Sequence, residues 1–415
     1  MKKEKESFLK KLGPGIITGA SDDDPSGIAT YSQAGAAFGY KTLWTALITF
    51  PLMAAVQEVC ARIGLVTQKG IVANINEHYP RWVLYVLFLF SFPAIVMNIG
   101  ADISAIGAVS HMLFPGIPAI YFSVVFTVVL ILSLVLLPYR KIAMILKWLC
   151  ITLFVYIIVP FITREDWLQV LKATFTPTFE LNSNFIGVLV AVLGTTISPY
   201  LFFWQANISV EDMVLKKQKK LSGRMLKDMR QDVFSGMFFS NMVMFFIILT
   251  TGAVLFKAGI RQIDTVDQAA KALEPLAGEK AYLLFAIGVL GTGLLAIPVL
   301  SGSISYMFSE VFNFREGLDK KFYEAKPFYI ILSISLILGL SLEYLGIKPV
   351  KALIYSAMLY GLTAPVSLAI ILHLANNKKI MGKYKNGWLS NTLGIITLIF
   401  MSVAAVLLVY LQFWP

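Results

Sequence analysis

Three consecutive aspartates, Asp22 to Asp24, stand directly before Pro25 in the middle of an apolar stretch that runs from Gly13 to Phe38. Proline has no N–H group and clashes with the preceding helical turn, so the carbonyl oxygens just before Pro25 lose their helical partners. Carboxylate and carbonyl oxygens together are the ligands that hard divalent cations prefer. The stretch therefore predicts a cation site with Asp24 as its charged ligand.

The three carboxylates are not expected to share one role, because each charge at the centre of a membrane costs at least ~2.5 to 3.5 kcal/mol. Asp23 is a further candidate ligand. Asp22 and Asp23 can instead face an aqueous vestibule or cap the helix that begins near Ile28. For Asp24, capping of that helix is the alternative to ion binding.

The composition decides which solvent surrounds this segment. The chain has 415 residues, of which 57% are hydrophobic and 14% charged, and its mean hydropathy is +0.74. Soluble domains carry about 25% charged residues, so the composition indicates an all-α membrane protein. Apolar runs of about 20 residues, the length that crosses a hydrocarbon core, predict eleven transmembrane helices: 13–38, 41–66, 83–111, 118–138, 144–163, 184–208, 231–256, 280–309, 327–346, 350–374 and 389–413.

Lys and Arg residues are spread unevenly along the chain, whose net charge is +11. They concentrate in the tail 1–12 and in residues 216–230 and 376–385. Because basic residues mark the cytoplasmic side of membrane proteins, this pattern places the N-terminus in the cytoplasm and the C-terminus on the opposite side. We expect these segments to contact anionic lipids and expect no nucleic-acid partner.

A second interruption lies in the sixth predicted span, where TTISPY at 195–200 breaks the apolar run before Pro199. The sixth span follows the first by five, and an odd number of spans per repeat reverses the direction of the second copy. Gly/Pro-interrupted segments at corresponding places in two inverted repeats mark the substrate site of many secondary transporters. The pattern predicts four parts: a cytoplasmic tail (1–12), a first five-helix repeat (13–163), a second (164–374), and a loop with the last helix (375–415).

Residues 13–44, GPGIITGASDDDPSGIATYSQAGAAFGYKTLW, resemble the first helix of the Nramp family of divalent-metal transporters, in which a DPGN motif breaks that helix. The resemblance covers most of the chain and continues through 57–80, 100–108, 232–241 and 359–382. It implies the LeuT-type fold, with two inverted five-helix repeats, broken helices 1 and 6, and one additional helix. It also implies a transporter rather than an enzyme, with no cofactor.

The departures from the family pattern concentrate at the metal site. Asp24 matches the aspartate of DPGN, but the asparagine falls at Gly27, which offers a carbonyl and no side chain. The family's MPH pattern in the sixth span is replaced by Ser198, Pro199 and Tyr200. A thioether has thus become a hydroxyl, and an imidazole has become a phenol.

This exchange of donor groups bears on the ion, because thioether sulfur favours softer transition metals whereas oxygen donors suit Mg²⁺ and Mn²⁺. Small residues at Gly27 and Ser198 also leave room for a partly hydrated ion, and Mg²⁺ keeps its waters tightly. The sequence is closest in these features to the Nramp-related magnesium transporter branch. The carbonyl near Thr195 and the hydroxyl of Thr363, which replaces a family glutamine, complete the candidate ligand set.

Proton coupling in the family depends on acids in the third span and on the histidine of the sixth. Asp102 is retained, but Ala105 stands where the family has glutamate, and Tyr200 cannot carry a proton near neutral pH as imidazole can. Asp102 and Tyr200 remain candidates for a proton or ion pathway. Asp232, at a family position near the inner vestibule, is a candidate either for gating or for an ion pair with the basic loop.

These observations predict a divalent metal transporter of the bacterial inner membrane that works by alternating access, favours Mg²⁺ and Mn²⁺, and is weakly or not coupled to protons. No obligatory protein partner is evident. A proton-coupled Mn²⁺ or Fe²⁺ importer is the first alternative. A LeuT-fold symporter of organic solutes is the second, although three acids would repel a substrate carboxylate. A metal sensor is the third, although no soluble signalling domain is visible.

Overall fold

The computed structural model describes residues 13–137, 151–217 and 221–413, and every regular element in these ranges is a helix. The predicted all-α architecture is therefore confirmed for this part of the chain. The long helices are α3 (Trp44–Thr67), α5 (Arg81–Leu113), α6 (Ala119–Leu136), α12 (Gly223–Thr251), α15 (Ala281–Phe312), α16 (Lys326–Ser341), α17 (Pro349–Asn376) and α19 (Trp388–Phe413).

Two helices are broken near their centres, at the two places that the sequence predicts. The first consists of α1 (Pro14–Asp22) and α2 (Pro25–Phe38), and the second of α10 (Ser183–Thr196) and α11 (Pro199–Leu215). In each pair the second half begins on a proline, whose missing N–H group is harmless at the first helical position. The same prolines prevent the first halves from continuing.

The number of membrane spans is settled only in part. Among the described residues, nine helical segments are long and apolar enough to cross a membrane. The first predicted span is absent from these nine because it consists of two short helices, and the fifth, 144–163, begins among residues outside the described ranges. The count of eleven therefore stays a prediction.

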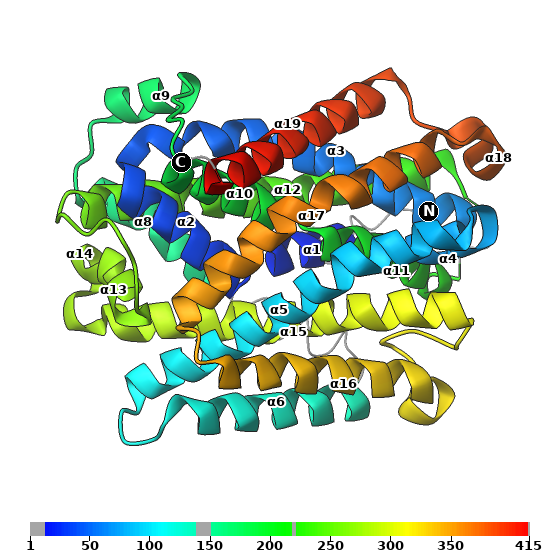
Figure 1. The fold of residues 1–415 in the computed structure, drawn as a ribbon, viewed down its shortest axis with the longest axis horizontal. Helices are drawn as coiled ribbons and strands as arrows, with labels where there is room; N and C mark the ends of the chain where they lie inside the picture. The colour runs from blue at the N-terminus through cyan, green and yellow to red at the C-terminus, as the bar shows by residue number, and fades with distance from the viewer. Residues whose placement is uncertain (1–12, 138–150, 218–220, 414–415) are drawn as a thin grey trace, which may run out of the picture.

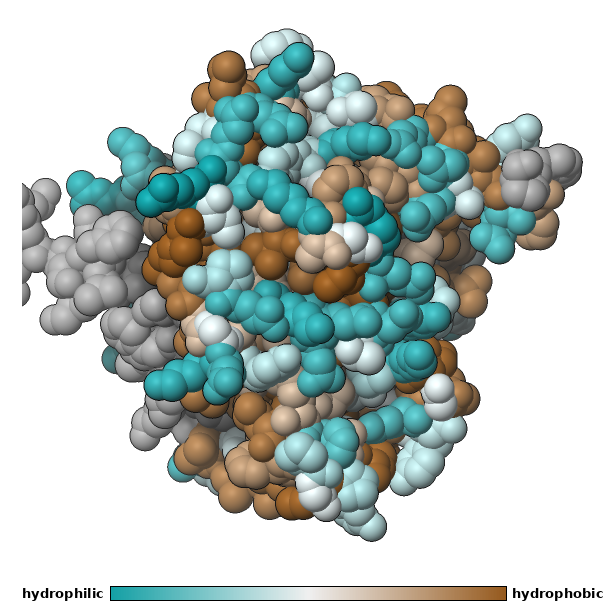
Figure 2. Space-filling view, turned by 90° about the vertical axis from the view of Figure 1, so that its left-hand side faces the viewer, coloured by the Kyte–Doolittle hydropathy of each residue, from teal (hydrophilic) through white to brown (hydrophobic). Residues whose placement is uncertain are grey.

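The helices run roughly along the long axis of the molecule, with short connecting helices at its two ends (Figure 1). One end carries α9 (Trp167–Phe175), α13 (Val266–Ala270) and α14 (Glu274–Ala277), and the other carries α4 (Ile71–His78) and α18 (Lys378–Met381). Hydrophilic residues spread across the first of these ends (Figure 2). The helix flanks, by contrast, expose large apolar side chains, such as Val125 and Leu132 on α6 and Ile399 and Val406 on α19. Such a belt suits contact with lipid.

Close glycine contacts set the positions of the first halves of both broken helices. A Cβ atom on Gly19 of α1 would lie 2.3 Å from the carbonyl oxygen of Gly236 on α12, and one on Gly194 of α10 would lie 2.1 Å from that of Ala357 on α17. Small residues at such contacts allow helix backbones to approach closely in a membrane. The contacts place the ends of α1 and α10 deep inside the molecule.

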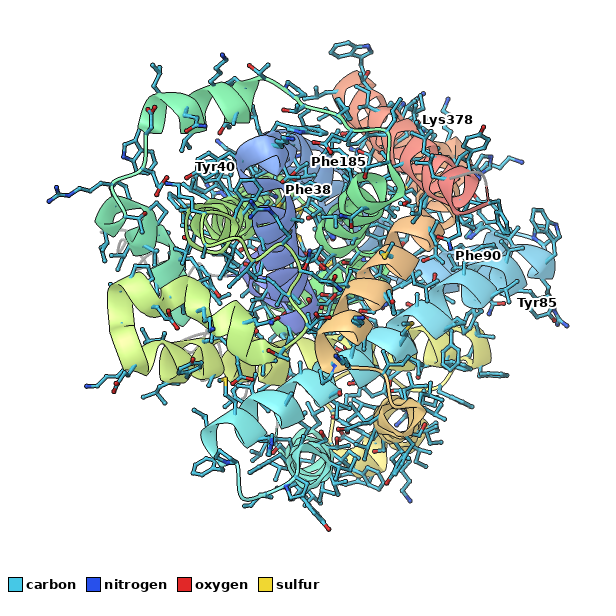
Figure 3. All side chains as sticks on the ribbon, turned by 60° about the vertical axis from the view of Figure 1, so that its left-hand side comes forward. Phe38, Tyr40, Tyr85, Phe90, Phe185 and Lys378 are labelled. Carbon is cyan, nitrogen blue, oxygen red and sulfur yellow. The ribbon has the colours of Figure 1, made fainter. Side chains whose placement is uncertain are left out.

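The halves α2 and α10 lie side by side near the end that carries α9. There the rings of Phe38 and Phe185 pack edge to face with their centroids 5.0 Å apart (Figure 3). The second half of the first broken helix, α2, thus packs against the first half of the second broken helix, α10.

Candidate ion site between the broken helices

Four helix ends meet at the centre of the molecule. A Cβ atom on Gly27, in the first turn of α2, would lie 3.3 Å from the carbonyl oxygen of Asp22 at the end of α1, and 3.4 Å from Oγ1 of Thr195 near the end of α10. The two breaks are therefore so close that one added methyl group would reach from the first to the second, and the Tyr31 hydroxyl of α2 already lies 3.1 Å from Oγ1 of Thr196 on α10. The C-terminal ends of α1 and α10 carry carbonyl groups that have no N–H partner in the helix, and their partial negative charge attracts cations.

Asp24 is held from two sides by hydrogen bonds. It is the N-cap of α2, where Oδ1 accepts a hydrogen bond of 2.7 Å from the Gly27 N–H group. Oδ2 accepts a second bond, of 2.8 Å, from the side-chain amide of Asn98 on α5. Asp24 is 1% exposed. A carboxylate offers about four lone-pair positions, so both oxygens of Asp24 retain one for an ion.

Asp22 and Asp23 share one hydroxyl donor, Ser240 on α12. Its Oγ lies 2.7 Å from Oδ2 of Asp22 and 3.3 Å from Oδ1 of Asp23. Both aspartates are buried, and the N-cap of α2 is Asp24. The structure thus places neither Asp22 nor Asp23 in an open vestibule or at the cap. Oδ1 of Asp22 has no hydrogen-bond partner among the described residues.

Asp102 on α5 adds a fourth buried carboxyl group to this region. It lies within electrostatic reach of Asp24 and near the Ser26 N–H group, yet neither of its carboxyl oxygens meets hydrogen-bond geometry with any described residue. Among the described residues, no Lys, Arg or His contributes a hydrogen bond or a nearby positive charge to these four carboxyl groups. A buried charge requires a partner, so this cluster calls for a cation or for protons.

The second break supplies only neutral groups. The Ser198 hydroxyl lies 2.5 Å from the Thr195 carbonyl oxygen and 3.0 Å from that of Gly194, so it points back to the end of α10. Tyr200 donates its hydroxyl to the Ser21 carbonyl at 2.9 Å, which joins α11 to α1. Ala105 and Tyr200 thus contribute neither an additional acid nor an imidazole to the surroundings of Asp102.

Two predicted residues form their hydrogen bonds elsewhere than with the acids of the first break. The Thr363 hydroxyl is bonded to the Leu359 carbonyl of its own helix, α17, at 2.9 Å. Asp232 lies at the opposite end of α1, where its carboxylate accepts bonds from the N–H groups of Gly13 and Gly15 at 3.0 and 2.6 Å. With a rise of about 1.5 Å per residue, the nine residues of α1 separate Asp232 from the break. Asp232, which belongs to α12, thus caps the start of α1. The basic loop includes residues 218–220, for which no structure is described.

Asn98 and Ser240 contact the acids directly but are not among the predicted residues. Asn98 stands one helical turn before Asp102 in an apolar span, and polar residues inside membranes are functional candidates by default. The spacing i, i+4 on one helix face was therefore a usable signal for Asn98. Ser240 carries no comparable signal, because single serines are common at helix contacts in membranes.

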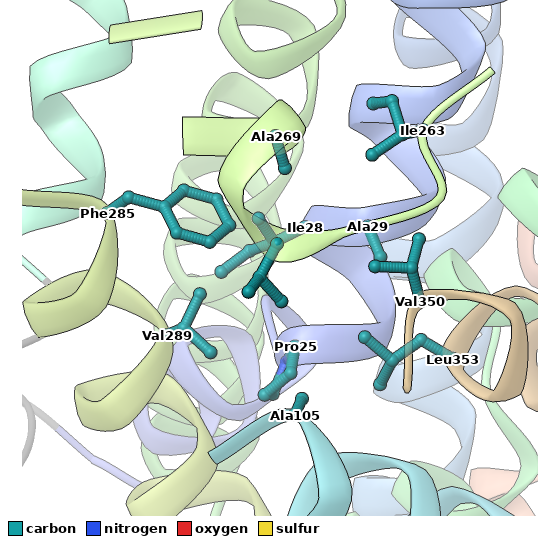
Figure 4. Close-up of a pocket in the computed structure, with 11 residues that line it drawn as sticks. Pro25, Ile28, Ala29, Ala105, Ile263, Ala269, Phe285, Val289, Val350 and Leu353 are labelled. Atoms are coloured by element: carbon teal, nitrogen blue, oxygen red, sulfur yellow. The ribbon is translucent and has the colours of Figure 1, made fainter. Parts of the chain in front are cut away.

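The passage from the breaks toward α13 is closed by apolar residues. A small cavity next to Pro25 is lined by Ile28 of α2, Phe285 of α15, Leu353 of α17 and Ala269 of α13 (Figure 4). The segment before α13 is fixed to α2 by the Gln33 side chain, which donates to the Arg261 carbonyl (3.0 Å) and accepts from the Ile263 N–H group (2.9 Å). The four aspartates are also buried, so their side chains have little contact with solvent in this structure.

Within the described ranges, no three His, Cys, Asp or Glu side chains converge closely enough to hold a metal ion. An ion at this place would therefore be bound by Asp24 together with backbone carbonyls, hydroxyls and its own water molecules. Mg²⁺ commonly binds proteins in this way, through one or two carboxylates and several waters.

Comparisons with known proteins agree with this architecture. The sequence profile of the Nramp family, described as natural resistance-associated macrophage protein-like, matches residues 15–411. The divalent metal cation transporter MntH of Caldanaerobacter subterraneus is 25% identical over 98% of this chain and 94% of that protein. The Bacillus subtilis protein of the same name is 23% identical over 97% of this chain and 92% of its own length.

Solved structures show the same fold. The manganese transporter of Eremococcus coleocola, in complex with an aromatic bis-isothiourea compound, superposes with a TM-score of 0.78 at 19% identity, covering 97% of this chain and 87% of that one. Mhp1, a nucleobase-cation-symport-1 family transporter, gives a TM-score of 0.56 at 13% identity, covering 97% and 92% of the two chains. The predicted LeuT-type fold is confirmed. The relatives carry the names of transporters, which confirms the prediction of a transporter rather than an enzyme.

Proposed function

The chain belongs to the Nramp family, and from this premise we propose that it carries a hard divalent cation, Mg²⁺ or Mn²⁺, across the membrane by alternating access, with weak or no coupling to protons. Transport of a divalent metal cation follows from the family and from relatives named divalent metal cation transporters. The choice of ion and the coupling are the finer parts of the proposal.

The observation that carries the proposal is the meeting of buried acids with the second break, without a basic counter-charge among the groups acting on them. Asp24 offers a free lone pair on each oxygen, and the ends of α1 and α10 offer carbonyl groups. Oxygen donors of this kind favour Mg²⁺ and Mn²⁺ over softer metals. Small residues at Gly27 and Ser198 leave space for retained water.

Calorimetric titration of Mg²⁺ and Mn²⁺ into the purified protein tests the site and the ion together. We expect binding of at least one of the two ions, with loss of the isotherm in Asp24→Ala. Absence of binding by the native protein, or unchanged binding by the variant, would contradict the proposal.

One observation favours the alternative of a transition-metal importer. The thioether of Met244 on α12 lies 3.6 Å from Oγ1 of Thr196, the last residue of α10. A soft donor is thus close to the second break, although Thr196 also bonds to Val192 and Tyr31. Competition by Cd²⁺ separates the two: a hard site predicts weak competition that Met244→Leu leaves unchanged, whereas strong competition that this variant abolishes would favour the alternative.

Weak proton coupling is supported by a residue of α5. Ala105, which is buried on the same helix as Asp102, provides no additional acid that could carry a proton. The inside-negative potential, worth about 2.3 kcal/mol per charge per 100 mV, is then the driving force for entry. Proteoliposomes that contain a pH dye test this: we expect metal uptake without stoichiometric acidification, and one proton per metal ion would refute it.

We further propose that the protein resides in the bacterial plasma membrane with its N-terminus in the cytoplasm and its C-terminus outside. The basic segments 216–230 and 376–385 support this orientation. The end that carries α9 and α13 is then extracytoplasmic. To check the orientation, the variant Leu168→Cys, at an exposed position of α9, is labelled in intact cells with a membrane-impermeant thiol reagent. We expect labelling of intact cells. Labelling only after the cells are lysed would show the opposite orientation.

A further inference from the structure

The side-chain amide of Asn98 stands between the ion-site carboxylate and a third helix. Its Nδ2 lies 2.8 Å from Oδ2 of Asp24 on α2, and its Oδ1 lies 2.8 Å from Oγ of Ser356 on α17. Asn98 and Ser356 are both fully buried. We propose that Asn98 is a positioning residue that fixes the Asp24 carboxylate for the ion, and that Ser356 fixes the amide. The inference rests on the proposed function, whose ion site it deepens.

The chemistry of the three groups sets the direction of this chain of hydrogen bonds. An ionised carboxylate only accepts hydrogen bonds, so the amide must present its NH₂ group to Asp24. Its carbonyl oxygen then faces the Ser356 hydroxyl, which also lies 2.7 Å from the Leu353 carbonyl oxygen of its own helix and shares its one proton between these two acceptors. Because an amide carries no charge and does not titrate, it holds Asp24 without adding to the charge of the site.

The geometry around Asp24 gives this bond its importance. The Gly27 N–H group fixes one carboxylate oxygen and Asn98 fixes the other. With both in place, the carboxylate plane has one orientation, and one lone pair of each oxygen stays available. Without Asn98, Oδ2 has no donor among the described residues, and the carboxylate can rotate about the Gly27 bond. An ion then has to select one orientation from several, which lowers its affinity.

Asp102 offers an internal comparison on the same helix. It stands one turn after Asn98, is equally buried, and has no hydrogen-bond partner among the described residues. The two acids near α5 thus differ in how they are held: Asp24 is fixed by two donors, whereas Asp102 is not. Of these two acids, Asp24 is therefore the one whose carboxylate has a fixed orientation, and Asn98 provides one of the two hydrogen bonds that fix it.

A purely structural role would be to join α5 to α17, and the chain contains a matched control for it. Ser91 of α5 and Ser367 of α17 are also buried and hydrogen-bonded at 3.2 Å, between the same two helices. This pair does not touch the acids. Ser91→Ala therefore removes a bond between α5 and α17 while it leaves Asp24 unchanged.

The experiment compares uptake of Mg²⁺ and Mn²⁺ into proteoliposomes by the native protein, Asn98→Ala, Asn98→Asp, Ser356→Ala and Ser91→Ala. We expect Asn98→Ala to raise the KM about tenfold or more, the effect of a hydrogen bond to a charged group, with a maximal rate within about twofold of the native protein. Asn98→Asp keeps the volume but loses the donor, so its KM should rise at least as much. Ser356→Ala should raise the KM less, because the amide can still donate.

Three outcomes would overturn the inference. One is a KM for Asn98→Ala that equals that of Ser91→Ala. Another is a change in maximal rate alone. The third is tighter binding by Asn98→Asp, which would show that the position favours an additional ligand over a donor. Thermal unfolding of each purified variant identifies those that fail to fold, and for these Asn98→Ser, which keeps a short donor, replaces alanine.

Uptake by Asp24→Ala, measured beside these variants, keeps this inference apart from the proposed function. If the native protein transports neither ion, the proposed function fails. If it transports an ion in a manner that depends on Asp24 but not on Asn98, the proposed function stands and the role of Asn98 fails.

Discussion

The two broken helices have the same backbone plan but opposite chemistry. In both, a helix ends at the centre of the molecule, a cap residue follows, and a second helix begins on proline. The cap of α2 is Asp24, whose side chain accepts a hydrogen bond from the Gly27 N–H group of the same helix. The cap of α11 is Ser198, whose hydroxyl turns back to the carbonyl groups of α10.

The charged groups and the neutral oxygen donors of the site therefore come from different breaks. All acids of the site come from the first break and α5, whereas the second break contributes hydroxyl and carbonyl groups. On the proposed function, the first break and α5 would supply the charge that attracts the ion, and the second break would set the space around it. Substitutions at the first break should change how tightly any divalent ion binds, and those at the second should change which ion binds.

The largest effect is expected for Asp24→Asn. The variant keeps the volume and a side-chain oxygen, but it removes the charge that opposes the dication, so affinity for Mg²⁺ and Mn²⁺ should fall about 100-fold or more. Calorimetry measures the change. Asp166→Asn is the matched control, because Asp166 is also an N-cap aspartate, of α9, and lies far along the chain on an exposed segment. Equal losses in both variants would contradict the role of Asp24.

Ser198→Met is expected to alter selectivity by about tenfold in the ratio of Cd²⁺ to Mg²⁺ affinity, since a thioether favours the softer ion. Competition uptake assays in proteoliposomes give this ratio. Ser198→Ala removes the hydroxyl without adding sulfur and should leave the ratio near its native value. A ratio unchanged by methionine would mean that the second break does not face the ion.

Gly27→Ala tests the contact between the breaks. The added methyl group would lie 3.3 to 3.4 Å from the Asp22 carbonyl and the Thr195 hydroxyl, so both breaks have to separate by a few tenths of an ångström. We expect a several-fold loss of ion affinity. Gly116→Ala, at a position with open space around it, should have no effect on binding. Native affinity in Gly27→Ala would place the ion elsewhere.

The smallest effect is expected for Thr363→Val, because the hydroxyl is satisfied by its own helix. Affinity and uptake should stay within about twofold of the native values. Thr195→Val, at the second break, should reduce affinity several-fold and so provides the comparison. If the order of the two variants is reversed, the site extends from the breaks toward α17.

The sequence predicts the breaks well because proline and consecutive acids act locally. Pro25 and Pro199 deprive the preceding turn of helical hydrogen bonds, and three aspartates in an apolar span require a special environment. Proline alone does not break a helix, since Pro51, Pro93, Pro298 and Pro365 lie inside continuous helices. The partners of those acids depend instead on which helices pack together, which a single sequence does not specify. Asn98 was within reach of prediction through its spacing from Asp102. Ser240 was not, and the position of Asp232 at the start of α1 depends on the contact between α1 and α12.

That last contact bears on how the site opens to the cytoplasm. Asp232 binds two N–H groups in the first turn of α1, and Gly19 and Gly236 bring the two backbones together further along. The two backbones are in direct contact at these points, so a displacement of α1 from α12 requires both hydrogen bonds to break. On the proposed function, release of the ion toward the cytoplasm would then depend on a carboxylate that lies outside the ion site.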